Sequence, residues 1–190
     1  MLRKVIIWPD KRLRSTNKKI ENVLNESELI KDLIDTCNVQ MGAGLAAPQI
    51  GINKQVVVIK PKVFGIQNPD PSEYNPDFMV IVNPEWVPSG EEITWKEGCL
   101  SLPNVEGKVT RHETCLLKYT NEKGEESRLI TEWPFSGGIQ HECDHLVGKL
   151  FFHRMDKKRG AFLLDRWRRK KRKEHIKAKR RKREANKRGQ

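Results

Sequence analysis

The chain has 190 residues and a formal net charge of +12, with 36% hydrophobic and 33% charged residues. This length fits one domain with a sizeable core and an appendage, and no apolar run is long enough to span a bilayer. Residues 1–10 hold an apolar stretch that is too short for a signal peptide and lacks a small-residue cleavage site. We therefore expect a cytoplasmic protein without membrane contact.

The four cysteines are widely spaced and lack the density of a disulfide scaffold. In a reducing compartment they are expected to be free thiols or metal ligands.

The positive charge is concentrated at the end of the chain. Residues 166–190 carry fifteen Lys or Arg against two Glu, a net charge of +13, whereas the whole chain carries +12. Residues 1–165 therefore have a net charge of −1 and are predicted to form the folded domain. Residues 166–190 are predicted to form a separate basic tail, helical or disordered.

The first third of the chain predicts a helix, a loop and a strand. Apolar residues recur at helical spacing in residues 26–40, where Ser27 is the expected N-cap. The small residues of 42–51 predict a loop whose backbone can approach another group closely. The β-branched run at 56–59 predicts a buried strand.

The middle of the chain predicts further strands separated by turns. Residues 61–76 are rich in Pro, Gly, Asn and Asp and predict a surface loop. Residues 78–82 predict a second strand that the following Asn-Pro pair ends. Residues 115–120 and 127–131 predict a hairpin whose turn lies at 121–124.

Two more helices are expected near the end. Residues 139–149 predict one helix that Gly148 closes. Another is expected to begin near Asp156 and to anchor to the domain through Phe162 and Trp167. Beyond that anchor the helix has almost no apolar stripe, so it is not expected to pack on the core.

The segment Gln140-His141-Glu142-Cys143-Asp144-His145 carries the strongest chemical signal. Residues four apart on a helix lie on one face, so His141 and His145 can reach one metal ion. Glu142 is then close enough to hold or relay a proton from a water molecule. This pattern predicts a hydrolytic metal site, although two histidines alone do not complete one.

The third ligand is expected upstream. His153 and Asp156 lie shortly downstream but are poor candidates, whereas Cys99 stands in the tight segment Glu97-Gly98-Cys99. One thiolate and two imidazoles leave an open position for water, as catalytic metal centres do.

These segments resemble the peptide deformylase family, whose members remove the N-formyl group from nascent polypeptides. Three signature segments stand in the family's order, at residues 42–49, 97–101 and 140–145, and the likeness extends over roughly residues 5–155. We therefore expect an α+β fold. Partly antiparallel β-sheets are expected around a central metal-binding helix, with an N-terminal helix and a basic C-terminal helical tail.

The resemblance implies a metal site made by Cys99, His141 and His145, which would hold one divalent ion. The family typically uses Fe(II), and Zn(II), Ni(II) or Co(II) can occupy the site, because this ligand set suits several borderline metals. Glu142 is the implied catalytic residue that takes a proton from the attacking water and delivers it to the leaving amine.

Further roles follow from the same resemblance. The Leu100 backbone N–H and the Gln49 side-chain amide are the implied donors to the oxyanion. Gly44, Gly98 and Leu100 are the implied substrate-binding positions, where the backbone pairs with an extended peptide. Glu97 and Arg111 are the implied structural ion pair.

Three departures from the family pattern stand in the sequence. Cys143 replaces a Met or Phe and is expected to face the core without binding the metal. Glu106 stands near a position where bacterial members often carry a substrate-contacting Arg. The loop at 61–76 is longer than usual.

The sequence leaves two alternative functions open. A HExxH metallopeptidase would have the same helix motif, but the upstream cysteine and the missing downstream ligand disfavour it. A catalytically inactive relative that binds the ribosome or RNA would act through the tail, but it would be expected to have lost a ligand or Glu142.

The tail is predicted to contact ribosomal RNA near the exit tunnel, because its charge exceeds what solubility requires and its lack of aromatics favours phosphate contacts. Bacterial deformylases similarly carry a basic C-terminal helix that docks on the ribosome. The protein is expected to be a monomer that acts on N-formyl-Met nascent peptides. The proposed RNA-binding residues are Arg166, Arg168, Arg169, Lys170, Lys171, Arg172 and Lys173.

Overall fold

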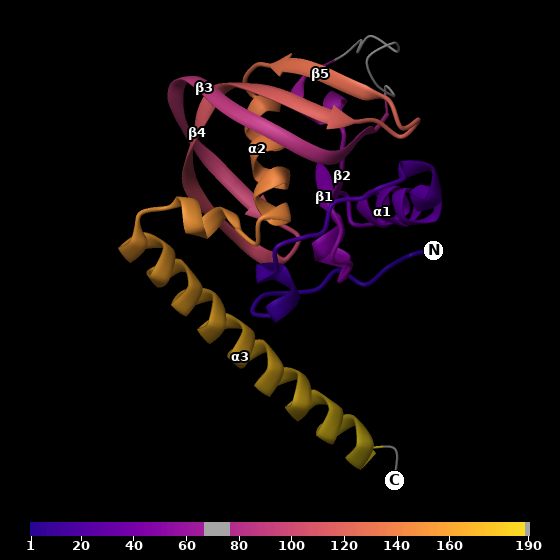
Figure 1. Cartoon of the computed structure of the whole chain (residues 1–190). Helices are drawn as coiled ribbons and strands as arrows, with labels where there is room; N and C mark the ends of the chain where they lie inside the picture. The colour runs from indigo at the N-terminus through magenta and orange to yellow at the C-terminus, as the bar shows by residue number, and fades with distance from the viewer. Residues whose placement is uncertain (67–76, 189–190) are drawn as a thin grey trace.

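The computed structural model describes residues 1–66 and 77–188. Its centre is a five-stranded sheet in the order β1-β2-β3-β4-β5, and every strand pair in it is antiparallel. Two long strands, β3 and β4, bend over the helix α2 (Phe135–Leu146), as Figure 1 shows. The α+β class is confirmed. The strands are β1 (Gly44–Ala46), β2 (Val56–Ile59), β3 (Met79–Cys99), β4 (Leu102–Thr120) and β5 (Glu126–Thr131).

Strand β2 lies between two hydrophobic layers, which explains its continuous β-branched sequence. Val56 and Val58 pack in one buried cluster with residues of α1 (Ser27–Val39), and Val57 and Ile59 pack in another with residues of α2 (Phe135–Leu146). Successive side chains of a strand point to opposite faces. The beginning of the sheet is therefore covered by a helix on each side.

The strand predicted at 78–82 does not end at Asn83-Pro84, so that expectation is wrong. Strand β3 continues to Cys99 with a register shift between Val82 and Glu85, where Asn83 adopts a φ of 50°. A bulge accommodates a proline because the missing N–H is not needed in the ladder there. The hairpin predicted at 115–131 is confirmed as the pairing of β4 with β5.

Two expected helix starts differ from the structure. Helix α1 begins at Ser27, and no side chain caps it. The short 3-10 helix η2 (Val23–Glu26) leads directly into it and is capped by the Asn22 side chain. Helix α2 begins at Phe135 rather than near residue 139. Gly148 follows its end with a φ of 71°, which fits the predicted helix-closing role.

Short 3-10 helices connect the larger elements. The segment at 42–51, predicted as a loop, contains β1 and η3, and the segment at 61–76 begins with η4. The remainder of the latter, residues 67–76, lies outside the described residues. The 3-10 helices are η1 (Lys11–Arg14), η2 (Val23–Glu26), η3 (Ala47–Ile50), η4 (Pro61–Phe64) and η5 (Phe151–Arg154).

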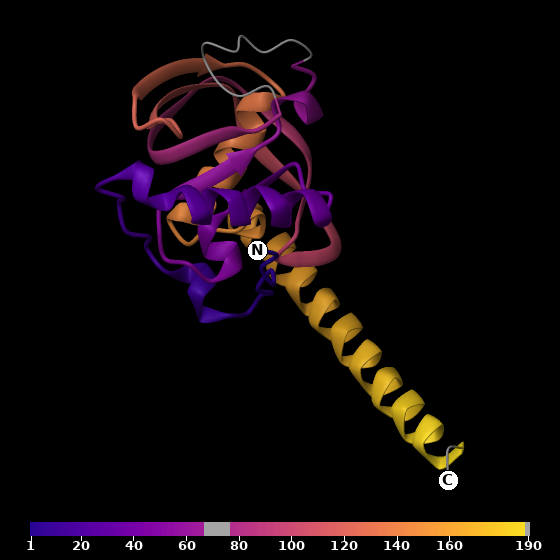
Figure 2. The same ribbon diagram turned by 90° about the vertical axis from the view of Figure 1, so that its right-hand side faces the viewer.

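Helix α3 (Lys157–Arg188) leaves the domain and extends away from it in both views (Figures 1 and 2). It docks only through its first turns: Trp167 is buried, and its Nε1 donates to the Pro103 carbonyl at 3.1 Å. The helix runs without a break through the predicted 165/166 boundary, and the division into domain and tail stays a prediction. In the described part of the chain, no helix combines the length and apolarity that a membrane crossing requires.

Candidate metal centre

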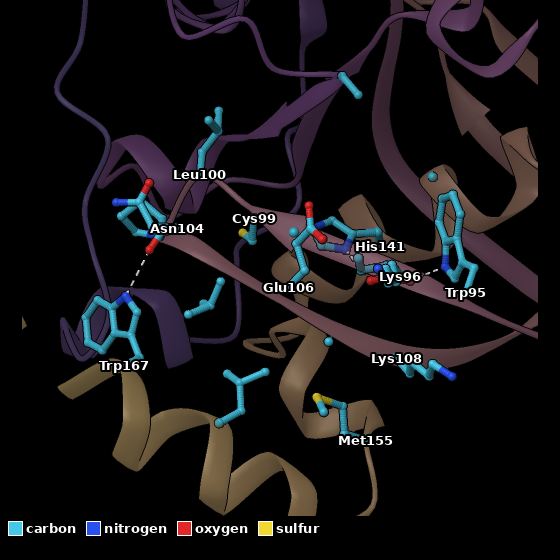
Figure 3. Close-up of a pocket in the computed structure, with 18 of the residues that line it drawn as sticks. Trp95, Lys96, Cys99, Leu100, Asn104, Glu106, Lys108, His141, Met155 and Trp167 are labelled. Atoms are coloured by element: carbon cyan, nitrogen blue, oxygen red, sulfur yellow. Dashed lines mark hydrogen bonds and ion pairs between the residues drawn. The ribbon is translucent and has the colours of Figure 1, made fainter. Parts of the chain in front are cut away.

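The end of β3 and one face of α2 bring together Cys99, His141 and His145. Their ligand atoms all lie within 4.8 Å of one another, and Cys99 Sγ is 3.4 Å from His145 Nε2. Figure 3 labels Cys99 and His141 among the residues that line the pocket. The upstream cysteine and the histidine pair thus meet as one potential set of metal ligands.

Helix α2 is held rigidly because all of its residues are buried. The Gln140 side chain accepts a hydrogen bond from the His112 backbone N–H at 3.2 Å and donates to the His112 carbonyl at 2.8 Å. Ser136 Oγ donates to the Glu113 carbonyl at 2.6 Å. These bonds attach the helix to the backbone of β4 and set where its histidines lie relative to Cys99.

The early start of α2 depends on two glycines. A Cβ at Gly138 would lie 2.4 Å from the Phe64 ring, and one at Gly137 would lie 2.8 Å from Trp133. Only residues without a side chain let these rings pack against the first turn of the helix.

A carboxylate orients the first histidine. Glu97 Oε2 is 2.6 Å from His141 Nδ1, which leaves Nε2 free to face the cluster. Arg111 Nε donates to Glu97 Oε1 at 2.7 Å, and the Trp95 indole N–H donates to the same oxygen at 2.7 Å. Carboxylates behind ligating histidines fix their tautomer and raise their basicity. The structure thus contains the Glu97–Arg111 pair that the family resemblance implied.

The network extends to residues that the sequence analysis missed. Arg111 also donates to Asp144 at 2.6 Å, and Arg154 donates to both Asp144 oxygens at 2.5 and 3.0 Å. The signal for Asp144 was present, because an acid on a helix with buried flanks requires a cation. Nothing local identified Arg154 as one of its partners.

Electrostatics favour a thiolate in the cluster. Burial raises the pKa of Cys99, but the charge of His145 and hydrogen bonds from both histidines outweigh it and lower that pKa to about 5. Burial lowers the pKa of His141, yet its bonds to Cys99 and Glu97 raise it well above the ordinary value. Thiolates are the form that binds metals, and a bound cation would take the place of the protons that these groups hold.

Glu142, which lies on α2, lines the same cavity as Cys99 and His141. A Cβ at Gly44 would lie only 2.7 Å from Glu142 Oε1, so the glycine leaves room for the carboxylate. Glu142 Oε2 and His145 Nδ1 are buried and have no hydrogen-bond partner among the described residues. Burial raises the pKa of Glu142. A buried acid with a raised pKa and an unsatisfied oxygen suits proton transfer.

Gln49 and Leu100 lie beside Cys99 in the same cavity. Gln49 Oε1 accepts from the Ala46 N–H at 2.8 Å, which directs its amide to Cys99 Sγ at 3.4 Å and Ser101 Oγ at 3.3 Å. Leu100 lies in the turn between β3 and β4. Gly44, Gln49, Gly98 and Leu100 all line the cavity that also contains Cys99, His141 and Glu142.

The donors suit a divalent metal such as iron, nickel, cobalt or zinc. One sulfur and two imidazole nitrogens within 4.8 Å match the ligand types that these metals prefer. Cys143 is not part of the set, since its side chain is buried in the core cluster between α2 and the sheet.

The basic tail residues predicted to bind RNA all lie on α3. Arg166 and Lys170 line the same cavity as Cys99 and His141, which the sequence did not indicate. Arg169 pairs with Asp165 at 2.9 Å and Lys171 with Glu174 at 3.1 Å. Glu106, the departure from the family pattern, is exposed and also lines the cavity.

Comparison with known proteins identifies the family. Residues 2–161 match the model of the polypeptide deformylase family. The peptide deformylase of Pseudoalteromonas translucida is 38% identical over 148 residues, which are 77% of this chain and 83% of the relative. That of Brachyspira hyodysenteriae is 36% identical over 159 residues and covers 82% of each chain.

Solved structures agree with the sequence relatives. A crystal structure of a peptide deformylase from Legionella pneumophila has a TM-score of 0.76 and 33% identity, and the match covers 92% of this chain and 98% of that one. The match extends over the domain that holds the Cys99, His141 and His145 cluster. The chain belongs to the peptide deformylase family.

Proposed function

We propose that this chain removes the formyl group from the N-terminal formylmethionine of nascent polypeptides and releases formate. The observation that carries the proposal is the cluster of Cys99, His141 and His145 beside Glu142, in a cavity of a deformylase-family chain. As in the rest of the family, the enzyme is a metal-dependent hydrolase.

Cys99, His141 and His145 would hold the divalent metal. When bound there, the ion would act as a Lewis acid and would lower the pKa of a bound water to about 7. Fe(II) is the metal proposed for the cell, with Zn(II), Ni(II) and Co(II) as workable substitutes. Glu97 keeps His141 oriented for binding through its 2.6 Å contact with Nδ1.

Glu142 moves the proton of the reaction. Its carboxylate takes a proton from the attacking water as oxygen bonds to the formyl carbon, and delivers it to the amine nitrogen when the C–N bond breaks. The products are formate and a peptide with a free amine. The raised pKa of Glu142 makes its carboxylate a stronger base toward the attacking water.

Gln49 and Leu100 stabilise the developing oxyanion. The Gln49 amide is already held by Ala46, so it needs little reorganisation during the reaction. The Leu100 N–H is the proposed second donor. Gly44 in β1 and Gly98 in β3 offer backbone groups to which an extended peptide can add as a strand.

The first experiment measures formate release from formyl-Met-Ala-Ser by protein purified anaerobically with Fe(II) or Ni(II). Turnover is expected with either metal, loss on chelation, and recovery when the metal returns. Because Cys99 is a ligand, Cys99→Ala is expected to lose both metal content and turnover. Full metal content without formate release would contradict the proposed function.

We further propose that the outer faces of α3 bind ribosomal RNA. The exposed residues Arg168, Arg169, Arg172 and Lys173 are available for phosphate contacts. Changing these four to Gln is expected to reduce co-sedimentation with ribosomes and to lower the salt slope by about 1 per lost contact.

A control removes the same charge elsewhere. Lys4, Lys11, Lys123 and Arg128 are exposed on the domain, and their change to Gln should leave ribosome binding intact. Equal loss in both variants would mean that only net charge matters and would contradict the tail proposal.

A further inference from the structure

The cavity at the metal centre does not end at the peptide-binding edges. It has a volume of about 1550 Å³ and continues from Cys99 and His141 past the β3–β4 hairpin to the first turns of α3. Figure 3 shows Glu106 and Lys108 on the hairpin, and Met155 and Trp167 from the segment that leads into and along α3. A substrate chain leaving the metal centre along this groove would run over the surface where the hairpin meets α3.

The groove has a basic rim. Its buried acids, Glu97 and Glu142, belong to the metal centre, and Glu106 is the one exposed acid among the described residues that line it. Six exposed basic side chains accompany it. They are Lys96, Lys108, Lys158, Arg159, Arg166 and Lys170.

Two of these six basic residues, Lys96 and Lys108, repel each other across neighbouring strands. Lys96 and Lys108 are directly opposite each other in the β3–β4 register. Like charges in directly opposed cross-strand positions destabilise a sheet. Both residues line the groove, so an anion bound there would relieve the repulsion.

One face of α3 completes the rim. Arg159, Phe162, Arg166 and Lys170 recur at helical spacing and all line the groove, whereas Arg168 does not. From residue 159 to residue 170 the helix rises about 16 Å, which equals about five residues of an extended peptide. The groove residues therefore share one face of α3, and Lys173, proposed above to bind RNA, lies on the same face beyond the groove.

We propose that this groove binds an acidic segment of the substrate, a few residues after the formylmethionine. The proposal rests on the deformylase function proposed above and names a substrate class for it. A peptide fits better than RNA because the rim is continuous with the metal centre and includes apolar groups, among them the 70% exposed Phe162. Such side chains can cover the stems of an extended peptide.

The test compares three formylated peptides of equal length. Each begins with formyl-Met-Ala-Ser and continues with Glu and Asp, with Gln and Asn, or with Lys. At low salt the acidic peptide is expected to have a KM about tenfold below the neutral one, from several exposed ion pairs. The basic peptide should have a higher KM, and high salt should remove the differences.

Variants locate the effect. Changing Lys158, Arg159, Arg166 and Lys170 together to Gln should bring the ratio of the acidic to the neutral KM close to one. Changing Glu106→Gln should increase the preference for the acidic peptide, because it removes the exposed acid of the groove. Thermal unfolding of each variant checks that it is folded.

A matched control removes four charges farther along the same helix, at Lys177, Lys179, Arg180 and Arg181, which do not line the groove. This control should keep the preference. If both quadruple variants lose it equally, net charge explains the result and the proposal is wrong.

The remaining outcomes are distinct. Turnover of formyl-Met-Ala-Ser without any charge preference in the longer peptides overturns this inference and leaves the deformylase function standing. No turnover of any formylated peptide overturns both. A groove variant that loses ribosome co-sedimentation but keeps the peptide preference assigns the rim to RNA and also overturns the inference.

Discussion

Replacing Glu142 with Ala is expected to lower formate release by at least about 100-fold while the metal stays bound. The side chain lies beside the cluster of Cys99, His141 and His145 but is not one of its three ligands. Its loss therefore removes proton transfer without removing a ligand. The measurement is formate release from formyl-Met-Ala-Ser, with metal content determined on the same samples.

The pH dependence adds a second readout. Burial raises the pKa of Glu142, and the carboxylate form is the one that accepts the proton. Activity should therefore fall with decreasing pH through a pKa above that of an ordinary glutamate. The residual activity of Glu142→Ala should lack this acid limb.

Glu142→Gln serves as the matched variant, because it keeps the size of the side chain but cannot take the proton. It should be as inactive as Glu142→Ala. A Gln variant with nearly full turnover and bound metal would show that Glu142 only fills space beside Gly44.

The second large effect is expected on stability. Arg111→Met should lower the free energy of unfolding by about 3–5 kcal/mol, because it leaves two buried carboxylates without their shared partner. Arg111 is 3% exposed and bonds both Glu97 and Asp144. The pKa shifts of Glu97 and Asp144 support this account. Burial alone would raise both pKa values, but Arg111 helps to hold them below their ordinary range. Chemical denaturation of the metal-free protein measures the change.

Two controls separate charge from packing. Arg180→Met breaks an exposed i,i+4 pair with Glu184 on α3 and should change stability little. Combining Arg111→Met with Glu97→Gln should recover part of the loss, since one uncompensated charge is then gone. A double variant less stable than Arg111→Met alone would contradict the account based on an unpaired charge.

Local patterns accounted for much of the fold. The β-branched run at 56–59, the hairpin at 115–131 and the helix with two histidines four apart are all present. Such features depend on periodicity and turn residues, which are readable within a short window. The strand end expected at Asn83-Pro84 failed because tertiary pairing with β4 overrides a local break by forming a bulge.

By itself, the sequence determined the chemistry of the site: a cysteine, two histidines and a glutamate in signature segments, and a tail with a net charge of +13. Tertiary structure alone decided which groups surround them. To the Glu97–Arg111 pair that the family resemblance implied, it added Asp144 and Arg154 in one buried network, and it placed Arg166 and Lys170 along the metal cavity. Ligand types and charge are properties of single residues and short motifs. Partners for buried charges depend on contacts between distant segments, which no local pattern encodes.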